Sequence, residues 1–117
     1  MKKILIVEDD LRLWDKWLSD MSENYELVFA GTREEAEVAF ADNNDISLIA
    51  MDGYLTLDLR QNDGRDLVIK FRRTFTGPMI AMSRSSLARE ELMAAGCEYE
   101  IMEKEGLANK VVEILGL

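Results

Sequence analysis

Polar side chains follow four of the short apolar runs in this chain, close to the point where each run ends. Three consecutive acids, residues 8–10, follow the first run, and later runs lead to Asp52, Ser83 and Lys104. If the fold brings these run ends together, the acids repel, since two like charges about 4 Å apart cost about 4 kcal/mol at an effective dielectric constant near 20. We therefore expect a cation among them.

The residue types restrict which cation this is. The chain contains no histidine and one cysteine, which excludes zinc sites of the Cys/His type and histidine-dependent triads. Oxygen ligands at an open site favour Mg²⁺, which keeps several waters and binds one or two carboxylates together with phosphate oxygens. A carboxylate beside that ion can attack phosphorus as a nucleophile. Lys104 would then neutralise phosphoryl charge, and the Ser83 hydroxyl would donate a hydrogen bond to a phosphoryl oxygen.

Five short apolar runs are expected to be the β-strands that carry these residues, with amphipathic helices between them. We expect strands at residues 3–7, 27–29, 46–51, 79–82 and 100–102, and helices at residues 11–21, 33–41, 65–73, 88–95 and 107–115. Thr32 and Glu35 form a capping box for the second helix, and Gly96 is placed to end the fourth.

Strands that are apolar throughout and alternate with helices predict an α/β fold, a doubly wound five-stranded parallel sheet with helices on both faces. In such sheets, ligands bind at the carboxyl ends of the strands, where the winding reverses. The acids, Asp52, Ser83 and Lys104 all follow strand ends, so this topology brings them to one edge.

Composition limits the class of protein. The 117 residues fit one domain, and 14 basic residues against 23 acidic ones give a net charge of −9. That charge disfavours binding to nucleic acid or to an anionic membrane surface.

The apolar runs are far shorter than the roughly 20 residues that span a bilayer. The N-terminus does not resemble a signal peptide, and the single Cys97 fits a reducing compartment. We expect a cytoplasmic protein.

In order and in type, these features resemble the receiver domain of two-component response regulators, over essentially the whole chain. KKILIVEDD resembles the first strand of that family with its acidic pair, and SLIAMDGYL is similar to the third strand with the phospho-acceptor. PMIAMS and AAGCEYEIMEK resemble strands four and five, and NDGRDL resembles the start of the third helix. The resemblance implies the flavodoxin-like fold of receiver type.

The resemblance also implies a role for each matched residue. Asp52 would accept the phosphoryl group, and Ser83 and Lys104 would take the hydroxyl and lysine roles. The Mg²⁺ ligands would be Glu8, Asp9 as the direct ligand, Asp52 and the backbone carbonyl of Tyr54.

Simpler interpretations of the same residues stay open. Asp52 precedes Gly53, and Asp-Gly is a turn dipeptide. The acids at residues 8–10 could be a solvated cluster favoured by a helix N-terminus, which is how we interpret Asp10. Trp14 and Trp17 recur at helical spacing and are interpreted as packing residues.

The sequence departs from the family pattern at several positions. Glu105 stands where a proline in a cis peptide usually follows the lysine, and Ile101 stands where an aromatic switch residue is usual. Arg84 replaces a small residue beside Ser83, and we hypothesise that its guanidinium crowds the site, either pairing with acids when metal is absent or slowing the access of a phosphodonor. Residues 55–63 are longer than the usual loop. Their alternating leucines suggest an extended segment, either a lid on the domain or a docking edge for a partner.

We therefore expect a single receiver domain over residues 1–117, without an output domain, acting as a switch and not as a turnover enzyme. A histidine kinase or phosphotransfer protein would phosphorylate Asp52, and a downstream protein would bind the product, with dimerisation on phosphorylation also expected. One alternative is a degenerate receiver that binds a partner without phosphorylation. A phosphatase of the haloacid dehalogenase type is disfavoured, because Tyr54 stands where its second acid belongs.

Overall fold

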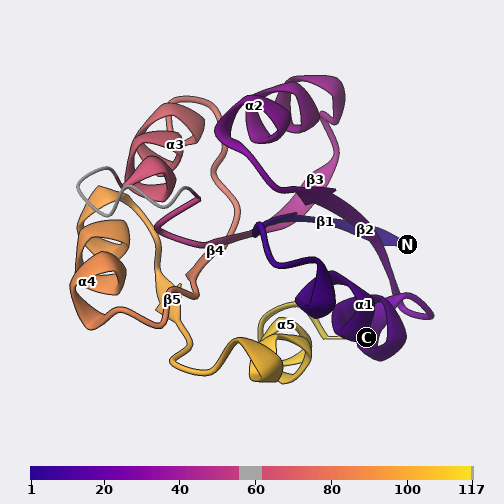
Figure 1. Ribbon diagram of the computed structural model, residues 1–117. Helices are drawn as coiled ribbons and strands as arrows, with labels where there is room; N and C mark the ends of the chain where they lie inside the picture. Colours follow the sequence, from indigo (N-terminus) through magenta and orange to yellow (C-terminus); the bar gives the residue numbers. More distant parts are fainter. Residues whose placement is uncertain (56–61, 117) are drawn as a thin grey trace.

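Five parallel strands form one sheet in a computed structural model that describes residues 1–55 and 62–116 (Figure 1). Their order across the sheet is β2-β1-β3-β4-β5. The strands are β1 (Lys2–Val7), β2 (Tyr25–Ala30), β3 (Ile46–Met51), β4 (Met79–Ala81) and β5 (Tyr99–Glu100). The predicted doubly wound α/β fold is confirmed.

Helices cover both faces of this sheet. They are α1 (Leu11–Met21), α2 (Arg33–Asp42), α3 (Asp63–Phe71), α4 (Ser86–Ala95) and α5 (Leu107–Leu115), with a 3₁₀ turn at Lys104–Gly106. Figure 1 shows α2, α3 and α4 on one side of the sheet and α1 and α5 on the other. In the described residues, no helix is long and apolar enough to cross a membrane.

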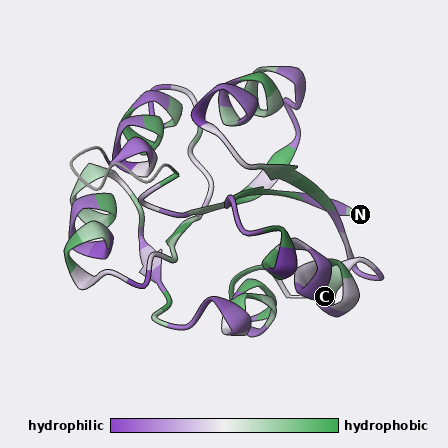
Figure 2. Cartoon of the chain, in the orientation of Figure 1, coloured by the Kyte–Doolittle hydropathy of each residue, from purple (hydrophilic) through white to green (hydrophobic). Residues whose placement is uncertain are grey.

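The strand sequences build two separate cores because successive side chains point to opposite faces. Leu5 and Val7 of β1 pack with α2, α3 and α4, whereas Ile4 and Ile6 pack with α1 and α5. Figure 2 shows hydrophobic residues along the central strands and mixed character on the helices. Apolar side chains on both faces of β1 thus hold the sheet between two helical layers.

Several predicted boundaries differ from the structure. Helix α3 begins at Asp63 rather than at residue 65, because the buried Asn62 side chain accepts a hydrogen bond from the Arg65 amide as N-cap. Helix α4 begins at Ser86 rather than at residue 88, since Ser85 is its N-cap. Strand β5 covers Tyr99–Glu100 and not residues 100–102, and β4 ends at Ala81.

Two cap signals in the sequence fare differently. Thr32 caps α2 by accepting from the Glu35 amide at 3.1 Å, as predicted. The Glu35 side chain, however, accepts from the Gly31 amide at 2.7 Å, one residue before the Thr32 amide that a capping box uses. Gly96 ends α4 with a φ of 144°, a conformation that favours glycine. Residues 56–61, which make up most of the predicted extended segment, lie outside the described residues.

The topology brings the carboxyl ends of the central strands together. The winding reverses between β1 and β3, which are neighbours in the sheet. Beyond the strands, the Asp52 amide donates to the Val7 carbonyl at 3.0 Å, and the Glu8 amide donates to the Ala30 carbonyl at 2.9 Å. The first bond fixes the residue after β3 beside the end of β1, and the second fixes the residue after β1 beside the end of β2. Such sheets bind ligands at this edge.

Candidate functional site

Three carboxylates meet at this edge. Oxygen atoms of Glu8, Asp9 and Asp52 all lie within 4.8 Å of one another. Glu8 and Asp52 are buried, and Asp9 is exposed at the mouth of the site. The amides of Asp9 and Asp10 both donate to Glu8 Oε2, at 3.0 and 3.2 Å. The predicted acid cluster therefore exists, with two members shielded from water and one open to it.

Lys104 supplies the positive charge on the inner side of the cluster. Its Nζ lies 2.5 Å from Glu8 Oε1 and 3.3 Å from Asp52 Oδ2, and the residue is 8% exposed. The other oxygen of Asp52 accepts from the Gly53 amide at 2.8 Å. One ammonium thus faces two buried carboxylates, with the third carboxylate, Asp9, beside them.

Three carboxylates share one ammonium, so negative charge is in excess at this site. Burial, and then repulsion from Asp52, raise the pKa of Glu8 to about 7 despite the ammonium of Lys104. Burial raises the pKa of Asp52 as well. Burial also disfavours the charged form of Lys104, but attraction to Asp52 and Glu8 outweighs it and raises the lysine pKa. A cation bound among these oxygens would relieve that excess.

The donor set fits a hard cation such as Mg²⁺. All of its side-chain ligands would be carboxylate oxygens, and the exposed position of Asp9 leaves the mouth open to water and phosphate. Tyr54 lies two residues after Asp52 and is partly buried. Its assignment as a carbonyl ligand stays a prediction.

Ser83 lies beside the residue that follows Asp52. A methyl group built on Gly53 would lie 3.5 Å from Ser83 Cβ, and the serine is 3% exposed. Ser83 Oγ accepts from the Ser85 amide at 3.3 Å, near the start of α4. The strand ends therefore bring Ser83, Lys104 and the three acids to one site, although the roles of these residues remain proposals.

Gly64 was not singled out from the sequence beyond its place in NDGRDL. A methyl group at this position would lie 1.9 Å from the Asp52 carbonyl oxygen. The Gly64 amide donates to the Gly53 carbonyl at 2.9 Å. The first turn of α3 thus approaches the backbone of the central acid so closely that only a residue without a side chain fits.

Three further residues that contact the site backbone were missed as well. Trp14 Nε1 donates to the Glu8 carbonyl at 2.7 Å, and Trp17 Nε1 donates to the Lys104 carbonyl at 3.1 Å. Arg89, which is 9% exposed, donates to the Ser83 carbonyl at 2.8 Å. The two tryptophans do pack, as predicted, but helical spacing alone gave no sign of their hydrogen bonds.

The hypothesis for Arg84 needs correction. Its Nη2 pairs with Glu105 Oε1 at 2.7 Å, so its acidic partner is at the rim and is not one of the three clustered carboxylates. None of the peptide bonds in the described residues is cis. Lys104 is therefore presented by a trans bond before Glu105. Ile101 is partly buried against the core on the α1 and α5 side.

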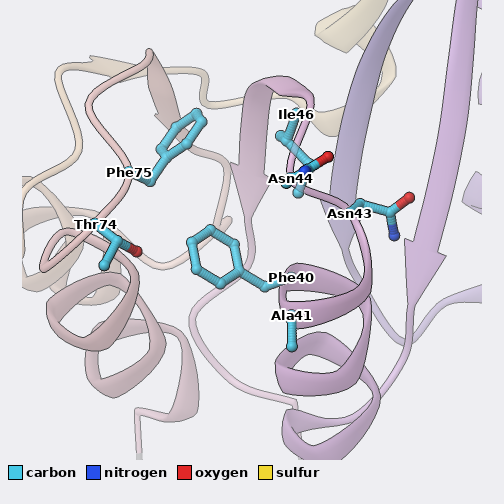
Figure 3. Close-up of a pocket in the computed structure, with 7 residues that line it drawn as sticks. All are labelled: Phe40, Ala41, Asn43, Asn44, Ile46, Thr74 and Phe75. Carbon is cyan, nitrogen blue, oxygen red and sulfur yellow. The ribbon is translucent and has the colours of Figure 1, made fainter.

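A separate pocket lies at the opposite end of the sheet. It has a volume of about 440 Å³ and lies between the ends of α2 and α3 and the start of β3. Figure 3 shows Phe40 and Phe75 among its lining residues. Because Ile46 begins β3 and Asp52 follows its end, this pocket is remote from the acids and has no part in their chemistry.

Comparison with solved structures identifies the class of this fold. A two-component response regulator from Clostridium difficile superposes with a TM-score of 0.82 at 24% identity, covering 98% of this chain and 96% of that one. A CheY-like receiver domain protein from Methanospirillum hungatei gives 0.79 at 25% identity, covering 97% and 92%. The Thermotoga maritima response regulator TrrA, in complex with Mg²⁺ and BeF, gives 0.79 at 22%, covering 98% and 100%.

No protein-family model and no curated protein matches the sequence. The fold and its acidic pocket nevertheless define one class of protein. The chain has the receiver-domain fold of two-component response regulators over nearly its whole length. The resemblance inferred from the ordered motifs is thereby confirmed, and the pocket of Glu8, Asp9 and Asp52 lies where the acidic pair and the acceptor were expected.

Proposed function

We propose that this protein is a single-domain response regulator, residues 1–117, that accepts a phosphoryl group on Asp52 and signals through protein contacts. The observation that carries the proposal is the close grouping of Glu8, Asp9 and Asp52, with Lys104 Nζ 3.3 Å from Asp52. Such a cluster lowers the stability of the fold because buried like charges repel, and a bound cation would offset that repulsion.

Glu8, Asp9, Asp52 and the Tyr54 carbonyl would hold Mg²⁺. When bound, the ion would draw negative charge from the phosphoryl oxygens. The single ammonium of Lys104 does not balance three clustered carboxylates and an incoming phosphoryl group, so we expect phosphorylation to require the metal.

The residues of the chain would then act as follows. A carboxylate oxygen of Asp52 forms a bond to phosphorus while the bond from phosphorus to the donor breaks, and the electron pair of that bond leaves with the donor. For a histidine kinase or phosphotransfer protein, the leaving atom is an imidazole nitrogen. Lys104 neutralises one phosphoryl oxygen, and the Ser83 hydroxyl donates a hydrogen bond to another.

A receiver is a signalling switch and not a turnover enzyme, so we propose at most weak self-phosphorylation and self-dephosphorylation. Its donor would be a histidine kinase or phosphotransfer protein in the cytoplasm. The net charge of −9 supports a protein partner for the output and disfavours nucleic acid or membrane. Dimerisation on phosphorylation is a further part of the proposal.

Intact-mass measurement tests the proposal. The protein is incubated with acetyl phosphate and Mg²⁺, beside Asp52→Asn and Asp10→Asn variants. Asp10 caps α1 by accepting from the Arg12 amide, and asparagine caps a helix equally well, so Asp10→Asn is a matched control. We expect a phosphoryl adduct in the parent and in Asp10→Asn. The adduct should be absent from Asp52→Asn and from samples with EDTA.

The degenerate receiver remains the alternative function. Ile101 and the trans bond before Glu105 favour it, because the usual aromatic switch and cis-proline are missing. No adduct in the parent under any condition would reject phosphorylation and support a binding scaffold. An adduct that persists in Asp52→Asn would instead show that another residue is the acceptor.

A further inference from the structure

Both tryptophans of this chain donate hydrogen bonds to backbone carbonyls of the candidate site. They lie three residues apart on α1, so both project toward the same side of the helix. Trp14 reaches the carbonyl of Glu8, and Trp17 reaches the carbonyl of Lys104. The side chains of these two partners meet in turn as an ion pair of 2.5 Å. Through its two indoles, helix α1 thus binds the backbone carbonyls of two site residues that belong to different loops.

The contact of Trp17 with Lys104 is buried. Trp17 is 0% exposed and packs in the core between α1, α5 and the sheet. The Lys104 carbonyl accepts from the Trp17 indole and also from the Leu107 amide, which closes the 3₁₀ turn. Both of its acceptor positions are therefore occupied. Without the indole, a buried carbonyl would lose a partner that water cannot easily replace.

Lys104 needs such a support. Its side chain is long and has many rotamers, and it must place one ammonium between Glu8 and Asp52. Its backbone is followed by Glu105 in a trans peptide, so no proline ring fixes the turn. The Trp17 indole binds the Lys104 carbonyl at the backbone end of the lysine. The carboxylates of Glu8 and Asp52 bind the ammonium at the other end of its side chain.

We propose that Trp17 is a positioning residue for Lys104: its indole N–H fixes the Lys104 backbone so that the ammonium meets Asp52 and the incoming phosphoryl group. The effect expected on the rate of Asp52 phosphorylation rests on the proposed function. The positioning itself is a property of the unphosphorylated protein and can be tested separately.

The kinetic test uses Trp17→Phe, which keeps an aromatic ring and removes the N–H. We expect the initial rate of Asp52 phosphorylation by acetyl phosphate to fall about fivefold, as for one lost buried hydrogen bond. In a Lys104→Met background, where no ammonium remains to be positioned, Trp17→Phe should cause little further change. Met21→Leu alters packing on the same face of α1 without touching a hydrogen bond, and it should leave the rate unchanged.

Phenylalanine is also smaller than tryptophan, so a second replacement separates shape from hydrogen bonding. Benzothienylalanine at position 17 keeps the two-ring shape and exchanges the N–H for sulfur. A rate equal to that of the parent with this residue would overturn the proposal. An equal slowing by Trp17→Phe in the parent and in Lys104→Met would also overturn it, since the effect would then not pass through the ammonium.

An NMR experiment without metal or phosphodonor tests the positioning directly. In Trp17→Phe, the amide signals of residues 104–107 should shift and exchange faster with solvent, whereas Met21→Leu should leave them in place. Unchanged amide signals would overturn the proposal. If the loop changes but the parent accepts no phosphoryl group, the positioning stands and the proposed function fails. If the parent is phosphorylated and Trp17→Phe changes neither the rate nor the amide signals of the loop, the proposed function stands and the positioning role of Trp17 fails.

Discussion

Arg84 and Glu105 form an ion pair of 2.7 Å between the two loops that carry Ser83 and Lys104. Arg84 directly follows the serine, and Glu105 directly follows the lysine. Both partners are about half exposed and line a pocket of about 360 Å³ together with residues from the start of α1. The pair therefore joins the outer ends of the loops while Ser83 and Lys104 lie inside.

Arg84→Ala should speed phosphorylation of Asp52 by acetyl phosphate. An exposed ion pair is weak, so we expect an increase of at most about fivefold. Initial rates by intact mass measure it. Glu105→Gln breaks the same pair and leaves the guanidinium in place. Equal acceleration in both variants would show that the ion pair slows phosphorylation. Acceleration in Arg84→Ala alone would show that the guanidinium itself slows it. An unchanged rate in Arg84→Ala contradicts the prediction.

Without metal, stability should fall as pH rises from about 4.5 to about 7. Burial and the charge of Asp52 raise the pKa of Glu8 from 4.5 to about 7, so the folded state binds more protons than the unfolded chain in this window. The raised pKa of Asp52 acts in the same direction. The raised pKa of Lys104 acts only at much higher pH. We expect a loss of roughly 2 to 3 kcal/mol from Glu8.

Urea unfolding at several pH values in EDTA measures this slope. Glu8→Gln should flatten it, because the amide does not titrate. A wild-type stability that is constant or rises over this window would show that Glu8 ionises normally in the folded protein.

Mg²⁺ should stabilise the fold. At about a hundred times its dissociation constant, an ion that binds only the folded state adds about 2.7 kcal/mol to the free energy of unfolding. Thermal unfolding with Mg²⁺ and with EDTA measures the effect. Asp9→Asn should abolish most of it, while Asp10→Asn should retain it. Equal Mg²⁺ stabilisation in both variants would exclude Asp9 as a ligand.

Gly64→Ala should destabilise the protein by about 3 kcal/mol, at the upper end of overpacking effects. Its methyl group would lie 1.9 Å from the Asp52 carbonyl oxygen, so either α3 or the acceptor backbone must move. Gly106→Ala is the matched control, since nothing lies within 4 Å of its added methyl group. Urea unfolding compares the two variants. A similar stability for both would mean that the approach of α3 to Asp52 is not tight.

Much of the fold could be predicted because its signals are local. The range of α1 was predicted as it stands in the structure, since its apolar residues repeat at helical spacing and an acid precedes it. The range of β3 was equally clear, because six residues without a charge lie between polar segments. The starts of α3 and α4 were missed by two residues each. Their boundaries depend on the side chains of Asn62 and Ser85, and polar residues near a helix start offer several equivalent caps.

The candidate site was predicted through order along the chain. Parallel strands place their carboxyl ends at one edge, so residues that follow different strands meet without any local signal between them. This reasoning located Glu8, Asp9, Asp52 and Lys104, and the structure groups them. It gave no information on the direction of Arg84, because a long side chain at a loop has several partners within reach.

The sequence by itself determined the strand and helix pattern and the identity of the acids, because periodicity and residue type are properties of the chain. Only the tertiary structure decided which side chains hold those residues in place. Trp17 meets the carbonyl of Lys104 from 87 residues away, and Gly64 meets that of Asp52 across a helix start. Contacts of this kind involve backbone groups that every residue carries. No residue pattern marks them, and they arise only when two elements pack at one distance and angle.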